Sequence, residues 1–369
     1  MHYQAKAGRI LAFGTAVGLI AAACGSGSTA SPSAAPASAA APSTDASQAA
    51  VSAAPSFAAP EKASIKIGLS TSGETSQFAE NLASQLDLYK KFGLTVEVAG
   101  FQGDGKVVQA VTAGALDFGV VGVSSAISSV KTDSPFKVVA MNGVTLTDGL
   151  VCGPSYKTAE DIKGKQIAVS TFGGTSHGSV LIMLDQLGLT ANDVVITQVG
   201  AQDARIAAVK AGSVACAPID LAKADAMTAA GLVTLTDNKS SGKQWGRSGL
   251  ATTVAFAQAN PNTVRAVVAA VLAAQNSMWT DPTTAAAKFA EYAQVDVAEA
   301  TKNIADFTAI GDRSMGWTDD AFNFPKLTLA TVNPAMADVD VSQAYDKSFL
   351  QGLYDAGYYT EIGNPEKPF

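Results

Sequence analysis

Short apolar runs alternate with stretches of helical spacing along the first two thirds of the chain. Residues 65–69 form one such run, and the apolar residues that follow it recur at helical spacing, at Phe78, Leu82, Leu86 and Tyr89. A run of this length beside a helical stretch is typical of a βα unit, in which a strand is followed by a helix. The pattern therefore predicts an α/β fold with mostly parallel sheets.

The same alternation predicts the remaining elements. Strands are expected at residues 95–101, 116–123, 138–144, 166–169, 194–199 and 214–219. Helices are expected at residues 77–92, 157–163, 263–279, 284–293, 297–307 and 341–354. Residues 150–153 and 249–257 are interpreted as two crossings between lobes, which would form a two-strand hinge.

One eight-residue sequence occurs twice. Its first copy is Ser70-Thr71-Ser72-Gly73-Glu74-Thr75-Ser76-Gln77, and its second copy is Ser170-Thr171-Phe172-Gly173-Gly174-Thr175-Ser176-His177. The similarity extends further, because residues 107–114, which start at Val107, match residues 205–212, which start at Arg205. A repeat this long indicates a duplicated domain rather than a solenoid. Two similar lobes imply a cleft between them, and this cleft is the predicted ligand site.

The first 62 residues have the pattern of export and tethering segments. Residues 1–23 combine a basic start with an apolar stretch too short to span a bilayer, as in a signal peptide. Ala21-Ala22-Ala23-Cys24 resembles the lipobox of a bacterial lipoprotein, so we expect a lipid on Cys24 that anchors the exported chain to the membrane. An ordinary secretory signal cleaved nearby is the alternative. Residues 24–62, mostly Ala, Ser and Pro, are predicted to be a disordered tether.

The folded part is predicted to consist of two lobes with interrupted connectivity. Residues 63–148 would form the first part of lobe one, and residues 149–248 would form lobe two. Residues 249–369 would contain the return crossing and the C-terminal helices, which would pack on lobe one.

Composition and charge argue against several classes of function. Hydrophobic residues make up 47% of the chain and charged residues 15%, as in a packed globular protein. The net charge of −7 at pH 7 argues against a nucleic-acid partner. No Cys and His cluster has metal-ligand spacing, and no nucleophile elbow, P-loop or Rossmann pattern is present. We therefore expect a binding protein that uses no cofactor, and not an enzyme.

Three motifs occur in an order that resembles a known family. They are YKKFGLTVEV at residues 89–98, TAGALDFG at residues 112–119 and DIKGKQIAV at residues 161–169. With them the chain resembles the periplasmic solute-binding proteins of ABC importers, in the group for nitrate, sulfonates, taurine and pyrimidine precursors. The resemblance implies a two-lobed type II binding-protein fold, a small-molecule ligand between the lobes, and delivery to the permease subunits of an ABC transporter outside the cytoplasm. We expect a monomer.

The resemblance also implies which residues contact the ligand. In the family, contacts come from the turn after the first strand of each lobe and from the turn after the aspartate-containing strand. The matching positions here are Ser70, Thr71, Ser72, Ser124, Ser125, Thr171, Thr175, Ser176 and His177. The chain departs from the family in the second lobe, where Gly-x-x-Asp-Ala is replaced by Gly212-Ser213-Val214-Ala215-Cys216.

The residues themselves leave alternatives open at this site. Hydroxyls at helix starts suit an oxyanion, because backbone N–H groups and the helix dipole favour negative charge there. The same hydroxyls can also be helix caps. His177 is expected to be neutral, as either a ligand contact or a cap. Trp245 and Arg247 could stack on and pair with a ligand, or lie in a solvated loop. Asp220 is interpreted as a cap rather than as a contact for an amino group.

The predicted function is capture of a small polar solute with an oxyanion, with a sulfonate favoured. The alternatives are a pyrimidine or thiamine-precursor-like ligand on the same fold, and a sensing lipoprotein without transport. Cys152 and Cys216 lie in strands that the resemblance places side by side, and export favours oxidation. We expect either a disulfide between them or two buried thiols.

Overall fold

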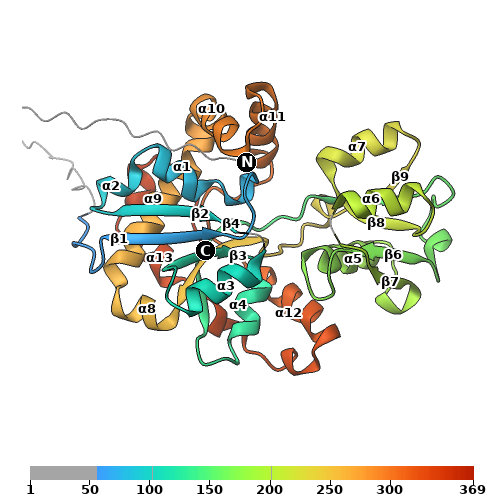
Figure 1. Cartoon of the computed structure of the whole chain (residues 1–369), viewed down its shortest axis with the longest axis horizontal. Helices are drawn as coiled ribbons and strands as arrows, with labels where there is room; N and C mark the ends of the chain where they lie inside the picture. Colours follow the sequence, from blue (N-terminus) through green and yellow to red (C-terminus); the bar gives the residue numbers. More distant parts are fainter. Residues whose placement is uncertain (1–55, 102, 201) are drawn as a thin grey trace, which may run out of the picture. The chain divides into compact units, whose positions relative to one another are not determined.

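Two five-stranded sheets form the framework of the computed structural model, which describes residues 56–101, 103–200 and 202–369 (Figure 1). The first sheet contains β1 (Ser64–Leu69), β2 (Thr95–Gly100), β3 (Phe118–Val121), β4 (Phe136–Gly143) and β10 (Ser248–Thr253). The second sheet contains β5 (Asp148–Cys152), β6 (Gln166–Val169), β7 (Val195–Gln198), β8 (Cys216–Asp220) and β9 (Val233–Asp237). The predicted α/β fold class with two sheets is confirmed.

Both sheets follow one plan, with strand orders β2-β1-β3-β10-β4 and β7-β6-β8-β5-β9. In each sheet the strand that directly precedes the repeated turn, β1 or β6, pairs in parallel with the next two strands of the chain. One strand in each sheet, β10 or β5, is antiparallel to both neighbours. Residues 144–147 lead into β5 and residues 238–247 lead into β10, so each antiparallel strand directly follows a crossing. Below, each sheet with the helices that pack on it is called the first or the second lobe.

The helices of the first lobe come from both ends of the chain. Before the first crossing these helices are α1 (Ala79–Gln85), α2 (Leu88–Lys91), α3 (Asp104–Thr112) and α4 (Val123–Ser129). After the second crossing they are α8 (Val254–Ala259), α9 (Pro261–Thr280), α10 (Pro282–Ala293), α11 (Val297–Thr308), α12 (Asp320–Val332), α13 (Ser348–Asp355) and α14 (Tyr358–Glu361). The second lobe has α5 (Thr175–Gln186), α6 (Gln202–Lys210) and α7 (Leu221–Ala229).

Short 3₁₀ helices fill the turns between these elements. They are η1 (Thr75–Gln77), η2 (Glu160–Ile162), η3 (Ala191–Asp193), η4 (Lys239–Ser241), η5 (Pro334–Met336) and η6 (Val341–Ala344). Within the described residues, no helix combines the length and the apolar character that a membrane crossing needs.

Several predicted elements differ from the structure. Residues 77–92, predicted as one helix, are divided among η1, α1 and α2, because Asp87 takes a left-handed backbone conformation (φ 55°) between α1 and α2. Residues 341–354 are divided between η6 and α13, since Tyr345 is extended. Residues 150–153 and 249–257 were predicted as crossings, but residues 150–152 form the end of β5, and residues 249–257 form most of β10 and the start of α8.

Strand β9 and helix α12 are among the elements that were not predicted from the sequence. The alternation in β9 spans only the five residues VTLTD, which is too short to stand out from its surroundings. Helix α12 contains Pro325 in its interior, and proline normally ends a helix because it lacks an N–H group. Helix α12 nevertheless matters for the architecture, because it packs on α4 of the first lobe and on α5 of the second.

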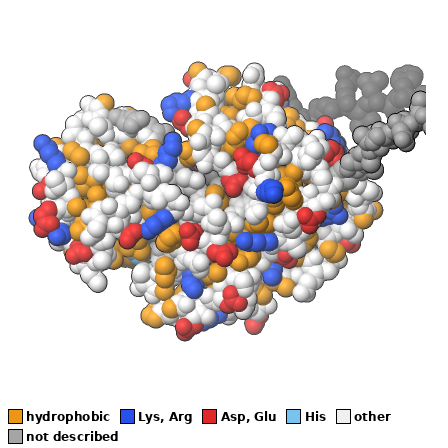
Figure 2. All heavy atoms as spheres, turned by 180° about the vertical axis from the view of Figure 1, so that it is seen from behind, with side chains coloured by type: hydrophobic (Ala, Val, Ile, Leu, Met, Phe, Trp, Pro, Cys, Tyr) orange, Lys and Arg blue, Asp and Glu red, His pale blue; other side chains and the backbone are white. Residues whose placement is uncertain are grey.

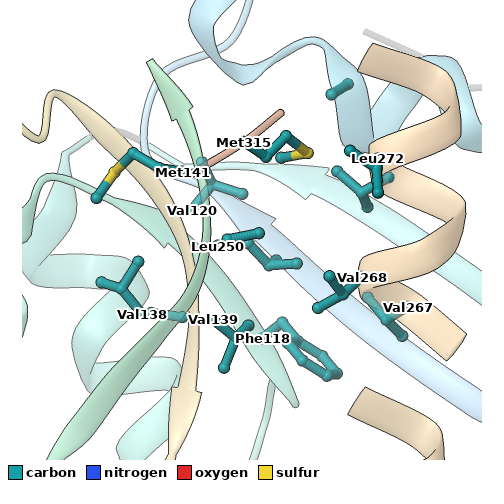
Figure 3. Close-up of a cluster of buried hydrophobic side chains, with 14 of the residues drawn as sticks. Phe118, Val120, Val138, Val139, Met141, Leu250, Val267, Val268, Leu272 and Met315 are labelled. Carbon is teal, nitrogen blue, oxygen red and sulfur yellow. The ribbon is translucent and has the colours of Figure 1, made fainter. Parts of the chain in front are cut away.

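Helix α9 lies at the centre of the core of the first lobe. Its side chains are buried around most of its circumference, as is expected of a helix with few polar positions. Figure 3 shows Val267 and Val268 of this helix facing Phe118 and Leu250 of the first sheet. Helices α1, α2, α10 and α13 cover its other sides. Helices α9, α10 and α13 therefore pack together in the first lobe.

The predicted N-terminal segments are only partly described. The signal peptide (1–23), the lipid on Cys24 and most of the tether (24–62) lie outside the described residues. The last part of the predicted tether is folded instead. The ring of Phe57 packs on Phe92, with 4.6 Å between the ring centroids, and on Tyr358. The described residues from 56 onward form one compact unit.

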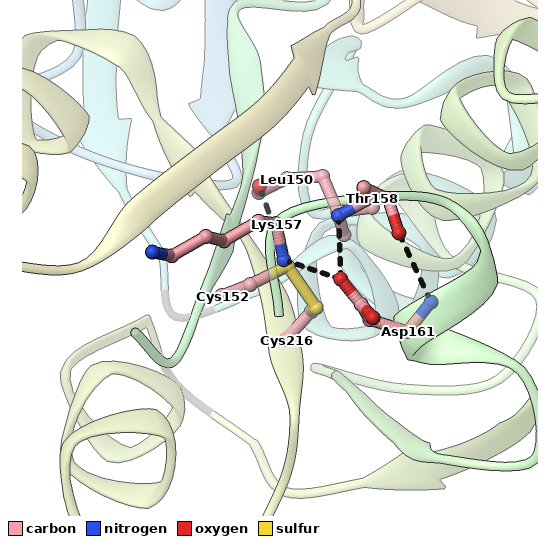
Figure 4. Close-up of a disulfide and its surroundings, with 6 residues drawn as sticks. All are labelled: Leu150, Cys152, Lys157, Thr158, Asp161 and Cys216. Carbon is pink, nitrogen blue, oxygen red and sulfur yellow. Dashed lines mark hydrogen bonds between the residues drawn. A yellow bond between two sulfur atoms is a disulfide. The ribbon is translucent and has the colours of Figure 1, made fainter. Parts of the chain in front are cut away.

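A disulfide between Cys152 and Cys216 joins the neighbouring strands β5 and β8 of the second sheet (Figure 4). The two residues lie directly opposite each other in the antiparallel pair β5–β8. Both are fully buried, beside Leu150 and Ile162. Of the two alternatives for these cysteines, the structure contains the disulfide.

Candidate functional site

The turn after β1 is held by the side chain of Gln77. Its Nε2 atom donates to Ser70 Oγ (2.9 Å), and its Oε1 atom accepts from the backbone N–H of Thr71 (3.1 Å). The backbone N–H of Ser70 donates to the carbonyl of Val120 on β3 (3.2 Å), which fixes the turn to the neighbouring strand. Gln77 is buried, and its role was not predicted. The side chain of Ser70 is therefore part of the brace that holds the turn.

The turn after β6 is held in the same way by different residues. Ser176 Oγ accepts from the backbone N–H of Ser170 (2.7 Å) and lies 2.7 Å from Ser170 Oγ. His177 Nδ1 accepts from the backbone N–H of Gly173 (3.0 Å). An accepting Nδ1 carries no proton, so the neutral ring has its hydrogen on Nε2. Burial lowers the pKa of His177, which agrees with the neutral ring expected from the sequence.

The predicted hydroxyls of the two repeated turns thus divide into two groups. Those of Ser70 and Ser176 brace their own turns. Four other hydroxyls have no hydrogen-bond partner among the residues that the structure describes, namely those of Thr71, Ser72, Thr171 and Thr175. Donors of the second group can turn toward a ligand without breaking a turn.

An open depression of about 560 Å³ lies beside the first turn. Ser70, Thr71 and Ser72 form one wall, and Gly100, Phe101 and Gly103 form the other. Gly100 allows this close approach, because a side chain at this position would collide with the hydroxyl of Ser72. Three predicted site residues therefore meet at a surface that can receive a small molecule.

Ser124 and Ser125 lie in the first turn of α4, which follows β3. Ser125 Oγ donates to Asp104 Oδ2 (3.0 Å), and the backbone N–H of Gly122 donates to the same oxygen (3.0 Å). Asp104, which was not predicted as a site residue, thus ties the start of α3 to the start of α4. Both helices begin at the same edge of the sheet as the Ser70 turn.

Trp245 is a core residue, and both of its predicted roles are wrong. Only 1% of its surface is exposed, so its ring offers no free face to a ligand and does not lie in a solvated loop. The ring packs directly on Gly178 of α5 and clusters with Leu146 and Ile182. Gly178 makes this contact possible, because any side chain at that position would overlap the indole.

Arg247 connects the second crossing to both the first crossing and the first turn. Its Nη1 atom donates to Thr147 Oγ1 (3.2 Å), and its Nη2 atom forms an ion pair with Glu74 Oε2 (3.4 Å). The side chain of Arg247 is 30% exposed and that of Glu74 is 43% exposed. Arg247 is therefore accessible, but a carboxylate of the protein already balances its charge in this structure.

A cluster of charged residues at the carboxyl edge of the second sheet was largely missed by the sequence analysis. Asp148 and Asp220 are opposite each other at the β5–β8 pair. Thr147 Oγ1 donates to Asp220 Oδ2 (3.0 Å), and the backbone N–H of Asp220 donates to the side chain of Gln202 (2.9 Å). Burial raises the pKa of Asp148, and the charge of Arg247 partly offsets this shift. The only signal for the cluster was Asp220, which directly follows an apolar run.

The surface and the described side chains limit other kinds of site. Figure 2 shows basic and acidic side chains interspersed over one face of the molecule, without the contiguous basic patch that nucleic acid would need. Among the described residues, no group of three or more His, Cys, Asp or Glu side chains has a geometry that could hold a metal ion.

Comparisons with known proteins agree with the resemblance noted in the sequence. A family model described as NMT1/THI5 like matches residues 78–285. A protein of Brucella abortus (strain 2308), named as a candidate binding protein, is 33% identical over 114 residues, which cover 31% of this chain and 34% of that protein. The chain thus matches about a third of the length of this relative. The taurine-binding periplasmic protein of Escherichia coli (strain K12) is 27% identical over 226 residues, 60% of this chain and 68% of that protein.

Solved structures extend the comparison to the fold. The periplasmic aliphatic sulphonate binding protein SsuA from Escherichia coli has a TM-score of 0.60 at 20% identity, covering 78% of this chain and 92% of that chain. The desulfurization enzyme DSZB has a TM-score of 0.55 at 14% identity, covering 79% and 99%. At these identities the likeness concerns the fold alone, and this fold includes both binding proteins and an enzyme. The family model covers more than half of the chain, and the chain therefore belongs to the NMT1/THI5-like family.

Proposed function

We propose that the protein is an extracytoplasmic solute-binding lipoprotein that captures a small oxyanion-bearing solute, with a sulfonate favoured, and delivers it to the permease of an ABC importer. The observation that carries the proposal is the pair of equivalent turns, one in each lobe. Thr71 and Thr171 occupy matching places in these turns, and neither hydroxyl has a hydrogen-bond partner among the described residues. Two such donor sets on separate lobes suit a ligand that bridges them.

The chemistry of the turns favours an anionic group on the solute. The turn that contains Thr171 leads directly into the twelve-residue helix α5, whose N-terminal N–H groups and dipole favour negative charge. Hydroxyl donors recognise sulfonate oxygens without requiring a buried cation at each oxygen. The names of the taurine-binding relative and of the sulphonate-binding structure support this class of solute.

Delivery to a permease requires that the liganded protein differ from the free protein. Because the two turns lie on different lobes, a bound solute would draw the lobes together about the two crossings at 144–147 and 238–247. The lipid proposed on Cys24 would keep the protein beside the membrane. An ordinary cleaved signal, a sensing role without transport, and a heterocyclic ligand are the competing outcomes.

Calorimetric titration of the secreted domain with taurine, ethanesulfonate, nitrate and a hydroxymethylpyrimidine tests the class of ligand. A sulfonate should bind, and Thr71→Ala and Thr171→Ala should each weaken its binding about ten- to a hundredfold, because each removes one hydrogen bond to a charged group. Thr301→Ala, an exposed hydroxyl on α11 of the first lobe, is the matched control and should leave binding unchanged.

Two results would overturn the proposal. Binding of the pyrimidine but of no anion would replace the ligand class. Sulfonate binding with unchanged affinity in both threonine variants would mean that these hydroxyls do not contact the solute. A comparison of membrane fractions for the full chain and for Cys24→Ala tests the lipid anchor separately, since only the variant should be released or remain unprocessed.

A further inference from the structure

Arg205 is a buried cation in the first turn of α6, in the second lobe. Only 6% of its surface is exposed, which is unusual for an arginine because burying a charge without a partner is costly. Its Nε atom is buried and has no hydrogen-bond partner in the part of the chain that the structure describes. A guanidinium does not lose its charge at neutral pH, so the cost is not avoided by deprotonation.

Other arginines of the protein are compensated where they approach the interior. Arg313 donates through Nε to Asn276 Oδ1 (2.7 Å) and through Nη2 to the carbonyl of Gly363 (2.9 Å). Arg265 also has a buried Nε without a partner, but its guanidinium stacks 5.2 Å from the ring centroid of Phe57. Among the described residues, no carboxylate forms an ion pair with Arg205 within 4.0 Å.

The repeat shows that a charge is not required at this position for folding. Arg205 occupies the place that Val107 holds in the first lobe. Val107 is fully buried and packs on Gly119 of β3, so the equivalent position of the first lobe is an ordinary core position. An arginine at this place in the second lobe therefore needs another explanation than packing.

The surroundings of Arg205 place it at the edge of the second sheet where the proposed ligand turn lies. Helix α6 packs on β6 and β8, and the Thr171 turn follows β6 directly. The first residue of α6, Gln202, accepts from the backbone of Asp220 at the end of β8 (2.9 Å). Burial lowers the pKa of the Arg205 guanidinium, and the charge of Asp148 offsets part of that shift.

We propose that Arg205, together with the N-terminus of α6, forms the subsite of the second lobe that binds the acid group of the solute. This inference rests on the proposed function and identifies Arg205 as the residue that supplies the positive charge at the ligand site. Asp148 acts on Arg205 only through its charge, and an anion placed there would supply the direct ion pair that no described carboxylate forms with Arg205, in a site shielded from water where such a pair is strong. Arg247, whose side chain is 30% exposed and already paired with Glu74, is then not the main anion contact.

The test combines binding with stability, using taurine and ethanesulfonate as probes. Arg205→Met should weaken binding of both probes at least tenfold, and Arg205→Lys should weaken it less, because the charge is kept but the fork of donors is lost. Without probe, Arg205→Met should melt at the same temperature as the wild type or higher, since an uncompensated buried charge is removed. Arg313→Met, the control, should lower the melting temperature and leave the affinity unchanged.

Each contrary outcome has a distinct meaning. If the wild type binds a sulfonate and Arg205→Met binds it equally well, the inference is wrong while the proposed function stands. A fall in melting temperature of Arg205→Met as large as that of Arg313→Met would identify Arg205 as a structural residue and overturn the inference. If the wild type binds neither probe, both the sulfonate function and this subsite are wrong.

Discussion

The turns that begin at Ser70 and Ser170 have equivalent places in two sheets of one plan, yet different side chains hold them. In the first lobe the brace is Gln77, a neutral amide that both donates and accepts. In the second lobe it is His177, whose ring accepts from Gly173 and can titrate. The next residue differs as well, since the first lobe has Phe78 and the second has Gly178. The two turns thus have equivalent places in their sheets, but different side chains hold them and pack beside them.

Trp245 provides the largest expected difference between the lobes. It fills the space over Gly178, whereas Phe78 at the equivalent position packs its own ring on Phe289 and Tyr292. Trp245→Ala should lower the free energy of unfolding by about 3–5 kcal/mol, the usual cost of removing a large buried aromatic side chain. Chemical denaturation measures this change. A cost below about 1 kcal/mol would show that the contact between the crossing and α5 is not tightly packed.

The disulfide is the next largest asymmetry, since it is found in the second sheet, between residues 64 apart in sequence. Replacing Cys152 and Cys216 together by alanine should cost about 2–4 kcal/mol, mainly because the unfolded chain regains freedom. Denaturation with and without reductant measures the effect. The reductant should lower the stability of the wild type and leave the double variant unchanged, and equal curves in all four samples would contradict the bond.

Glu80 is expected to make the stability of the first lobe depend on pH. It is fully buried on α1, where Asn142 Nδ2 donates to both of its carboxylate oxygens (2.8 and 2.9 Å). Burial raises the pKa of Glu80 to about 7. The folded state therefore binds a proton that the unfolded state has released, and stability should fall by about 2–3 kcal/mol as the pH rises from about 4.5 to about 7, then level off.

Glu80→Gln keeps the shape of the side chain and should flatten this part of the stability curve. Urea unfolding at several pH values between 4 and 8 gives the comparison. If the free energy of unfolding of Glu80→Gln changes with pH as steeply as that of the wild type, a group other than Glu80 causes the pH dependence.

The smallest expected effect comes from replacing His177, which holds the second turn, by glutamine, the residue type that holds the first turn. In His177→Gln, the new side-chain oxygen can accept from the N–H of Gly173, as the amide oxygen of Gln77 accepts from Thr71. Because the pKa of His177 is lowered by burial, the wild type should lose stability as the pH falls below the unfolded value of about 6.5. The variant should lack this loss. Melting temperatures at pH 5 and pH 7.5 compare the two proteins.

Much of the fold could be predicted because it depends on local pattern. The strands that begin at Ile65 and Gln166 stood out as apolar runs, and the repeat identified the second lobe. The roles of Trp245 and Gln77 could not be predicted in this way, since they depend on contacts between segments that the sequence does not bring together. Trp245 looked like a loop residue because its neighbours are polar, and its partner is a glycine on a distant helix.

The candidate site was predicted in outline but not in its charges. The hydroxyls of Thr71 and Thr171 were named from the turns, and they remain candidates for ligand contact. The burial of Arg205 was not predicted, because a single arginine in a helix usually lies at the surface. The repeat nevertheless aligns Arg205 with Val107. Comparing the two copies of a repeat position by position, with burial in mind, would have identified it.

The antiparallel strand β10 also determines the order in which the protein can fold during or after export. β10 lies between β3 and β4 in the middle of the first sheet, but it is the last strand of that sheet to be synthesised, after the whole of the second sheet. All five strands of the second lobe, β5 to β9, are contiguous in the chain and can pair as soon as they emerge. Until β10 has been synthesised, the first sheet lacks the strand that joins β3 to β4. We therefore expect the second lobe to fold first, and the first lobe to complete its sheet afterwards.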